Sequence, residues 1–455
     1  MTVMVSNSSI NYSTSDEEDK VIPVKQDKGS SPIGSVFIIV NAALGAGLLS
    51  FPQAFVFAGG VIRGLVLEVC LAILMAINLV VIAYATELSR ANSYQQMIKR
   101  LFGSIAATIV QICIILYTFG SCVTYTVIIG DQVEKLFELL PNQLYLQWYF
   151  DRRIWTSAIA IIFIFPLCLF RNIRFLNWPS LAGVCSCLYI SIMTFTVYFI
   201  RDSQNRTATQ FDVSDDPSWS AFKFFSALPI FCFGYQCHLA TVPVYAGLKK
   251  KSVPKFVFIA IAAILICFWV YTLTGVFGFL TFGVTVDPDV IKSYDAHNTL
   301  VIIARIGLLV SMITSYPLLA FLGRSPTDEF VVQTIRLLSI KWSNLTILTV
   351  DTGKTQLFRL QLISLCWFAI SLLLGVFLPS IEVVITPIGG VAAMFSIVYP
   401  GFLIVSYAVG ARSRSSLWKQ ILYIGFGGVV VYVGSFIGGY SATQGVINLV
   451  VPRNI

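Results

Sequence analysis

Charged residues are scarce in this sequence. Asp, Glu, Lys and Arg make up 11% of its 455 residues and 57% are hydrophobic, whereas a soluble globular domain carries roughly 25% charged residues. This composition excludes an ordinary soluble domain and indicates a protein that crosses a membrane several times. The formal net charge of +8 does not indicate a nucleic acid partner, because nearly all the basic residues lie between the apolar runs or at their ends, where they act as orientation signals.

Motifs of enzymes and of nucleotide-driven pumps are missing as well. The chain has no G-x-x-x-x-G-K-[ST], H-E-x-x-H or G-x-S-x-G pattern. We therefore expect no enzymatic activity, no cofactor, and an ion gradient rather than ATP as the energy source. All ten cysteines fall inside apolar runs, which disfavours both a disulfide-stapled loop and a Cys–His metal cage.

Eleven runs of about 20 apolar residues are long enough to cross a bilayer as helices. The predicted spans are 33–57, 60–87, 107–131, 154–171, 179–200, 224–245, 255–282, 298–322, 357–378, 380–407 and 419–441. The sequence therefore predicts an all-α integral membrane protein in three parts. We expect a disordered N-terminal tail over 1–32, an eleven-helix domain over 33–441 and a short C-terminal tail over 442–455.

Lys and Arg predict the orientation of these spans. They are more than twice as frequent on the side of the N-terminus as on the opposite side, and such a bias marks the cytosolic face. We therefore expect a cytosolic N-terminus and a lumenal or extracellular C-terminus. Asn205 begins an N-glycosylation sequon in the predicted outward loop 201–223, although similar sequons occur on the other side and do not decide the matter.

The first span is interrupted near its centre. Gly45 and Gly47 lie two residues apart within Asn41–Pro52 and weaken the helix at membrane depth. Bare backbone in hydrocarbon costs several kcal/mol per unsatisfied group, so a break persists only against protein or a wet cavity. A broken helix therefore predicts a binding site, and the half-helix that restarts after Gly47 would favour an anion such as a carboxylate.

The sixth span has a second interruption, which we expect between Pro229 and Gly234. It begins a second group of five spans. Because five is odd, the second group must be inserted upside down relative to the first. The sequence therefore predicts a 5+5 inverted repeat with broken helices 1 and 6, whose gaps face each other near the midplane, followed by one additional span.

Two groups of oxygen-bearing side chains are candidates for a cation site. Asn41 lies one turn before the first break, where it would either coordinate Na⁺ or bond a neighbouring helix. Thr314 and Ser315 precede Pro317 in the eighth span. Their hydroxyls would either complete the oxygen shell begun at Asn41 or satisfy the backbone that the proline disrupts.

Polar side chains form a stripe on the third span. Tyr117, Ser121, Thr124 and Tyr125 follow helical spacing, and the stripe lines either a cavity or a helix contact. In a cavity, Tyr117 or Tyr125 would reach a substrate carboxylate.

Arginine and histidine are rare within the predicted spans. Arg305 is either functional or snorkels from the eighth span to the surface. His238, just beyond the second break, is either a candidate for proton coupling or a packed neutral histidine.

Four stretches carry a resemblance to a known family. They are Val40–Leu49, Ile129–Gln132, Phe233–His238 and Gly278–Asp289. From about residue 33 to 441 the chain resembles the sodium-coupled neutral amino acid transporter family of the amino acid/auxin permease group. The last two stretches are most similar to the branch that carries glutamine and asparagine at the lysosomal membrane.

The resemblance implies an eleven-span inverted repeat of the LeuT type that works by alternating access. It associates Asn41 and Thr314 or Ser315 with the cation, and the backbone of Leu44, Gly45, Ala46 and Gly47 with the α-carboxylate. Lumenal loops without cysteine depart from the plasma-membrane branch, so the lysosomal membrane is favoured over the plasma membrane.

The resulting hypothesis is a secondary active transporter of small neutral L-amino acids, glutamine or asparagine first, coupled to Na⁺ or H⁺. Its side-chain pocket would be lined by Phe231, Cys232, Phe233 and Gly234. The partners are these amino acids and the lipid bilayer, and the sequence leaves the oligomeric state open. The alternative is an amino acid sensor of the same fold that signals from the lysosomal membrane, with the N-terminal tail and the predicted loop 323–356 as docking sites.

Overall fold

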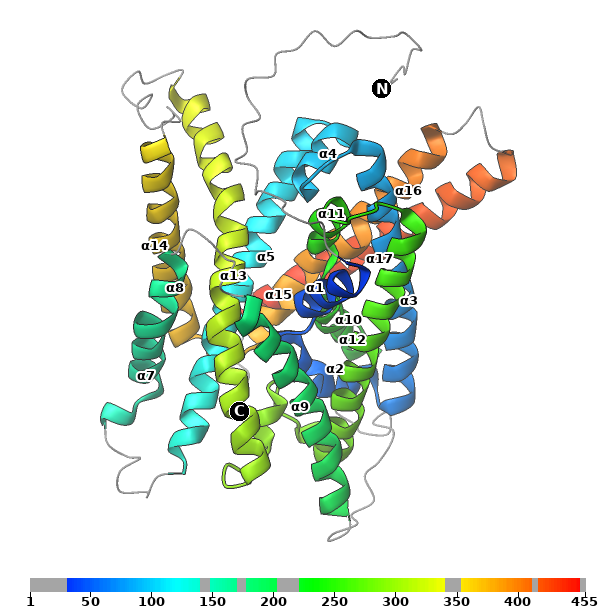
Figure 1. Cartoon of the computed structure of the whole chain (residues 1–455). Helices are drawn as coiled ribbons and strands as arrows, with labels where there is room; N and C mark the ends of the chain where they lie inside the picture. Colours follow the sequence, from blue (N-terminus) through cyan, green and yellow to red (C-terminus); the bar gives the residue numbers. More distant parts are fainter. Residues whose placement is uncertain are drawn as a thin grey trace.

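The protein is a bundle of helices, seen here in a computed structural model (Figure 1). The structure describes residues 31–139, 148–169, 177–202, 221–339, 353–410 and 416–450. Within these ranges ten helices are long and apolar enough to cross a membrane, or eleven when the bent pair at the start is counted as one crossing. Helices dominate because a segment in lipid must satisfy its own backbone N–H and C=O groups. The prediction of an all-α membrane protein with about eleven spans is confirmed.

The elements fall into two groups. The first contains α1 (Pro32–Ala43), η1 (Ala46–Ser50), α2 (Phe51–Ala58), α3 (Val61–Ser89), α4 (Tyr94–Phe102), α5 (Ser104–Phe137), η2 (Trp148–Phe150), α7 (Arg152–Ile159), η3 (Ala160–Ile164), α8 (Phe165–Leu169) and α9 (Asn177–Asp202). The second contains α10 (Ala221–Gly234), α11 (His238–Ala246), α12 (Val253–Phe282), η5 (Gly283–Thr285), η6 (Val290–Ser293), α13 (Thr299–Ser339), α14 (Gly353–Phe377), α15 (Glu382–Ala393), η8 (Met394–Val398), α16 (Tyr399–Gly410) and α17 (Leu417–Val450).

The first crossing is broken where the glycines predict it. Helix α1 ends at Ala43, the chain bends by 52°, and a short 3₁₀ segment leads into α2 at Phe51. The irregular part is therefore longer than the predicted 45–47, because the α-helix restarts at Phe51 and not directly after Gly47.

The sixth crossing is also broken, but not at its proline. Helix α10 runs through Pro229 to Gly234, and the gap covers residues 235–237. The prediction that Pro229 begins the break is therefore wrong. At this point the backbone of α15 lies against α10, since a Cβ on Gly389 would stand 2.1 Å from the Pro229 carbonyl oxygen. This close packing supports the helix across the one hydrogen bond that proline cannot make.

The two broken crossings run in opposite directions and meet at the centre. Helix α1 lies above α2 whereas α11 lies above α10 (Figure 1). We call the end of the bundle where α1 begins the α1 end and the opposite one the α2 end. A Cβ on Gly47 would stand 2.7 Å from the Gly234 Cα, so the two breaks are in direct backbone contact. The predicted inverted repeat with facing breaks 1 and 6 is confirmed.

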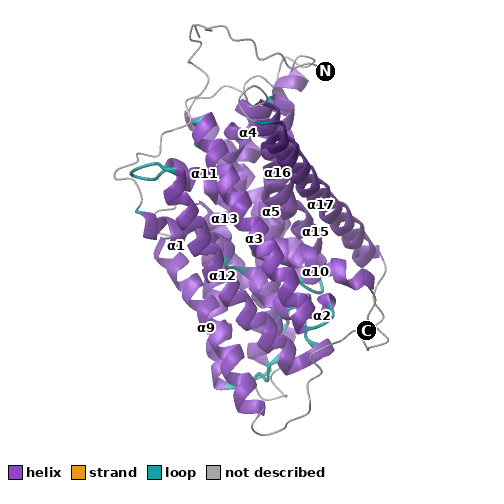
Figure 2. Ribbon diagram, turned by 90° about the vertical axis from the view of Figure 1, so that its right-hand side faces the viewer, coloured by secondary structure: helices purple, strands orange, loops and turns teal. Residues whose placement is uncertain are grey.

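Three predicted boundaries change. Most of the predicted loop 323–356 is helical, because α13 continues to Ser339 and α14 begins at Gly353. This extension is held by the ion pair between Arg359 Nε and Asp328 Oδ1 at 2.8 Å. Helix α17 runs to Val450, so much of the predicted tail 442–455 is helical (Figure 2). The predicted N-terminal tail, apart from its last two residues, lies outside the described residues.

The contact between the breaks generates a prediction about stability. Gly47→Ala places a methyl group against the Gly234 backbone, which cannot move aside as a side chain would. Overpacking of this kind costs about 1–3 kcal/mol, so we expect a lower melting temperature of the purified protein in detergent. The matched control is Gly439→Ala in α17, where a Cβ meets nothing within 4 Å. An unchanged melting temperature for Gly47→Ala would contradict this packing.

Candidate functional site at the two helix breaks

A tyrosine from a third helix joins the ends of both half-helices. The hydroxyl of Tyr271 in α12 lies 2.7 Å from the carbonyl oxygen of Ala43 and 2.7 Å from that of Gly234. These are the last residues of α1 and α10. The last carbonyls of a helix receive no hydrogen bond from an N–H of the same helix. The hydroxyl has one proton and donates to one of the two carbonyls at a time, so the other carbonyl oxygen keeps its lone pairs available for another donor.

Aromatic rings fill the space around this hydroxyl. Phe51, the first residue of α2, stacks on Tyr271 with centroids 4.2 Å apart and meets Phe231 edge-on at 5.1 Å. Tyr235 in the second break packs edge-on against Tyr271 at 5.1 Å. A Cβ on Gly234 would stand 2.5 Å from the Phe51 ring. Edge-on and offset ring pairs of this kind stabilise a rigid apolar wall.

A buried carboxylic group from α3 supports the second break. Glu68 is fully buried, and its two oxygens accept hydrogen bonds from the Tyr235 hydroxyl at 3.0 Å and the Thr272 hydroxyl at 3.1 Å. Each oxygen thus has a donor, as a buried acid requires. Glu68 therefore fixes Tyr235, which in turn packs on Tyr271.

Buried polar atoms without partners gather at the second break. The side chain of Gln236 is 3% exposed, and neither its Nε2 nor its Oε1 makes a hydrogen bond within the part of the chain that the structure describes. The same holds for the Thr241 hydroxyl and for Nδ1 of His238, whose Nε2 lies 3.3 Å from the Met75 carbonyl oxygen. Burying such groups without partners costs about 1–3 kcal/mol each. An arrangement like this is suited to a polar ligand.

The first break exposes backbone N–H groups. Those of Gly45, Ala46 and Gly47 donate to no backbone carbonyl in the described residues, whereas the Leu48 N–H reaches the Gly45 oxygen at 3.2 Å. Leu44, Ala46 and Gly47 are buried and Gly45 is half-buried. Free N–H groups at the start of a half-helix attract a carboxylate.

The tyrosines of the predicted stripe on α5 each approach one break. Tyr117 packs against Phe233 with centroids 6.2 Å apart, and a Cβ on Gly45 would stand 3.2 Å from the Tyr125 hydroxyl. The hydroxyls of Ser121 and Thr124 instead donate to carbonyls one turn earlier in α5. The tyrosines therefore border the site, and the smaller hydroxyls serve their own helix.

Within the described residues, no hydrogen bond joins Asn41 to Thr314 or Ser315. Asn41 is half-buried in the last turn of α1, which packs against α12, α11 and α9. Thr314 donates its hydroxyl to the Val310 carbonyl of its own helix at 2.8 Å, which is not the carbonyl of residue 313 that Pro317 leaves without an N–H partner. Its oxygen retains lone pairs for a cation. Ser315 faces α9, with its hydroxyl oxygen 4.0 Å from the Cβ position of Gly183.

The pocket residues predicted on α10 are all buried. Phe231 and Cys232 are fully buried and Phe233 is 6% exposed. Phe231 faces Phe51, whereas Phe233 faces Tyr117. The structure thus brings the predicted residues of α10, the first break and α5 together. Asn205 lies outside the described residues.

The α2 end of the site is closed. Gln53 Nε2 donates to Glu382 Oε2 at 3.0 Å, and the Ser50 hydroxyl donates to the Pro288 carbonyl oxygen at 2.8 Å. These bonds tie α2 and η1 to α15 and to the segment after α12. Paired polar groups therefore hold the first broken crossing to its neighbours at this end.

The α1 end is more open. One face of α1 carries exposed Ile33, Phe37 and Ile38, and continues to half-exposed Asn41 and Gly45. An asparagine beside bare backbone does not face lipid, because both need polar partners. This face of α1, which leads to the first break, is not covered by other helices within the described residues.

Two residues of this site were not predicted from the sequence. Tyr271 sits in an apolar helix and carries no local signal. Gln236 follows the predicted break by two residues, so a polar amide beside an interrupted helix was the signal available for it. Only the structure shows that the amide of Gln236 is buried without a hydrogen-bond partner in the described residues, which makes Gln236 a candidate ligand-binding residue.

Comparisons with known proteins agree with this geometry. Residues 28–441 match the family described as transmembrane amino acid transporter protein. Sodium-coupled neutral amino acid transporter 7 of Danio rerio is 34% identical over 94% of this chain and 90% of its own length. The Homo sapiens protein of that name is 34% identical over 92% and 89%, and solute carrier family 38 member 8 of Homo sapiens is 32% identical over 91% and 94%.

A solved structure has the same fold. The crystal structure of MhsT in complex with L-phenylalanine matches with a TM-score of 0.51 at 14% identity, over 92% of this chain and 99% of that one. At this identity the likeness concerns the fold alone. The LeuT-type fold and the family match together indicate a transporter and not an enzyme. The chain belongs to the transmembrane amino acid transporter family and is similar to sodium-coupled neutral amino acid transporters.

Proposed function

We propose that the protein is a secondary active transporter of small neutral L-amino acids, with glutamine and asparagine first, driven by Na⁺ or H⁺. The observation that carries the proposal is the meeting of the two breaks, which places free N–H groups, helix-end carbonyls and apolar rings around one point. A zwitterion with a compact side chain matches these three features. The names of the sodium-coupled relatives support the same substrate class.

The backbone of the two breaks holds the common part of the substrate. The α-carboxylate accepts hydrogen bonds from the N–H groups of Gly45, Ala46 and Gly47, which have no backbone acceptor in the described residues. The positive end of the half-helix dipole adds to this attraction. The α-ammonium faces the helix-end carbonyls of Ala43 and Gly234, next to the Tyr271 hydroxyl.

The side chain of the substrate meets Phe231, Phe233 and Gln236. The phenylalanines supply apolar walls, and Gln236 supplies one amide N–H₂ and one amide oxygen, both buried and unpartnered in the described residues. A substrate amide satisfies both atoms at once, donating to Oε1 and accepting from Nε2. Glutamine and asparagine therefore fit this pocket better than aliphatic amino acids do.

The cation is coordinated by oxygens from α1 and α13. Asn41 supplies an amide oxygen, and Thr314 and Ser315 supply hydroxyl oxygens. Na⁺ binding at these residues draws α1 toward α13 and covers the exposed face of α1. Where H⁺ replaces Na⁺, His238 is the candidate in the second break, because its Nδ1 has no partner in the described residues.

The unequal closure of the two ends supports alternating access. The α2 end is tied by Gln53–Glu382 and Ser50–Pro288, while one face of α1 is uncovered. Binding of substrate and cation biases the two arrangements. By the Lys and Arg distribution the α1 end faces the cytosol, and the short lumenal loops without cysteine favour a lysosomal membrane.

Counterflow in proteoliposomes tests the function. Purified protein loaded with unlabelled glutamine is mixed with labelled amino acids, with and without Na⁺ and at two pH values. We expect exchange of labelled glutamine and asparagine, and little exchange of lysine or glutamate. Failure to exchange any neutral amino acid would reject transport and favour the sensor alternative.

Removing the amide of Asn41 should separate coupling from folding. We expect Asn41→Ala to abolish the dependence of uptake on the cation while the protein stays monodisperse in detergent, because one oxygen ligand is lost from a half-buried position. Initial rates with and without Na⁺ measure the effect. Asn92→Ala, at an exposed position before α4, is the matched control. Normal cation dependence in Asn41→Ala would refute the assignment.

Gln236 should decide between amide and aliphatic substrates. Gln236→Leu keeps the size of the side chain and removes both amide atoms, so we expect KM for glutamine to rise about tenfold with little change for alanine. Competition uptake measures the two KM values. Gln333→Leu, exposed on α13, is the control. Equal changes for both substrates would show that Gln236 does not read the side chain.

A further inference from the structure

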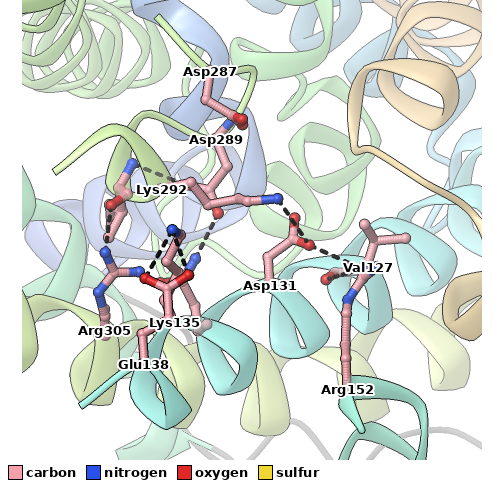
Figure 3. Close-up of polar contacts among 11 residues, drawn as sticks. Val127, Asp131, Lys135, Glu138, Arg152, Asp287, Asp289, Lys292 and Arg305 are labelled. Carbon is pink, nitrogen blue, oxygen red and sulfur yellow. Dashed lines mark hydrogen bonds and ion pairs between the residues drawn. The ribbon is translucent and has the colours of Figure 1, made fainter. Parts of the chain in front are cut away.

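A second cluster of polar side chains, most of them charged, is drawn in Figure 3 and includes Asp131, Asp289 and Arg305. It joins α5, α7, α13 and the segment 286–298 between α12 and α13, which we call the 286–298 loop. Gln132, Asp289 and Arg305 are fully buried and Asp131 is 1% exposed. Arg305 therefore does not snorkel to the surface, and the functional interpretation of this intramembrane charge is left.

The two aspartates of the cluster have different partners. Asp131 Oδ1 lies 2.9 Å from Arg152 Nη2 and 3.5 Å from Lys292 Nζ, so it is paired directly with two cations. Asp289 has no ion pair within the described residues. Its Oδ2 accepts from Gln132 Nε2 at 2.5 Å and its Oδ1 from the Ile291 N–H at 3.0 Å.

The amide of Gln132 can bridge Asp289 and Arg305 in only one orientation. While its Nε2 donates to Asp289, its Oε1 accepts from Arg305 Nη1 at 3.2 Å. If Asp289 carries a proton and donates it to the amide, Gln132 must turn its oxygen toward Asp289. Its N–H₂ then faces Arg305, which has only donors, and the bond between them is lost.

Arg305 holds the 286–298 loop in place. Its Nη2 donates to the carbonyl oxygens of Ile291 at 2.8 Å and Tyr294 at 3.3 Å. The same loop contacts the first break, because the Ser50 hydroxyl at the end of η1 donates to the Pro288 carbonyl oxygen at 2.8 Å. Pro288 directly precedes Asp289. A change at Asp289 therefore acts on the anchor of the loop and on its bond to the first broken helix.

Burial and neighbouring carboxylates favour the neutral form of Asp289. Burial, together with the carboxylates of Asp131 and Asp287, raises the pKa of Asp289 to about 7, against the opposite effect of Lys292 and the Ile291 N–H. The charged and titratable groups that face the site are Asp131 on α5, with Glu134 beside it, Glu138 just after α5, Arg152 on α7, Asp287, Lys292 and Asp295 in the loop, and Arg305 on α13. Half-exposed Asp287 and partly exposed Lys292 connect the site to water.

We propose that Asp289, Gln132 and Arg305 form a proton-binding site that controls opening of the α2 end. Asp289 takes a proton from the compartment at that end, Gln132 turns, and Arg305 loosens its hold on the 286–298 loop. The loop then releases Ser50 and the first broken helix. The expected effect on uptake rests on the proposed transport function, whereas the expected effect on the 286–298 loop does not.

The sign of the pH dependence follows from the raised pKa. An unperturbed aspartate has a pKa of about 3.9, so the folded protein holds this proton between roughly pH 4 and 7 and loses it as the pH rises through about 7. The α2 end is therefore expected to be latched at pH 8 and released at pH 5.5. Uptake from the α2 side should be faster when that side is acidic.

Hydrogen exchange of the full-length protein tests the loop without relying on transport. After correction for intrinsic rates, we expect peptides covering 286–298 to exchange about tenfold faster at pH 5.5 than at pH 8, as the loss of one charge-assisted hydrogen bond implies. Asp289→Asn should exchange fast at both pH values. The control Asp295→Asn makes the same change at an exposed position of the same loop and should keep the wild-type response.

Uptake into proteoliposomes from the α2 side supplies the second readout. We expect a pH-dependent rate in the wild type and in Asp295→Asn, and a flat profile between pH 5.5 and 8 in Asp289→Asn. A wild-type loop that exchanges equally at both pH values would overturn the proposal, as would an Asp289→Asn variant with the wild-type pH response. A pH-dependent loop in a protein without flux would reject the proposed transport and leave the proton site standing.

Discussion

Two interrupted helices can share the centre of a membrane protein only if the backbone groups that they expose find partners. Here the breaks meet glycine to glycine, and one tyrosine hydroxyl lies 2.7 Å from the last carbonyl of each half-helix. The remaining N–H groups of the first break have no backbone acceptor in the described residues. Because unpaired backbone groups are costly in lipid, these N–H groups need another hydrogen-bond acceptor.

The surroundings of the breaks separate rigid from movable parts. Stacked rings of Phe51 and Tyr271, with Glu68 holding Tyr235, fix the half-helices α2 and α10 relative to α12 and α3. Helix α1 lacks such a wall on one face, where it is exposed. Motion of α1 therefore costs fewer packed contacts than motion of α2, which is tied by Gln53 and Ser50. The hydrogen bonds of Gln53 and Ser50 are polar, so a change of charge nearby can weaken them, unlike the ring contacts.

The errors of the sequence-based predictions have physical causes in the packing. Pro229 was expected to break its helix, but the backbone of α15 lies against it and the helix continues. The predicted loop 323–356 is mostly helix, since a buried Arg359–Asp328 pair joins α13 and α14 beyond their apolar runs. In both cases the local sequence did not decide the conformation, because the contact that stabilises the helix comes from a residue distant in the sequence.

The sequence by itself determined the number of spans, the inverted repeat and the position of the first break, because apolar length and glycine placement act locally on helices in lipid. It also pointed to the first break, α10 and α5, whose predicted residues the structure brings together. Only the tertiary structure decided that Tyr271 joins both breaks, that Gln236 is buried without a partner, and that Asp289 reaches Arg305 through Gln132. Such contacts depend on which side chains from helices distant in the sequence are buried against one another, and the local sequence does not determine this.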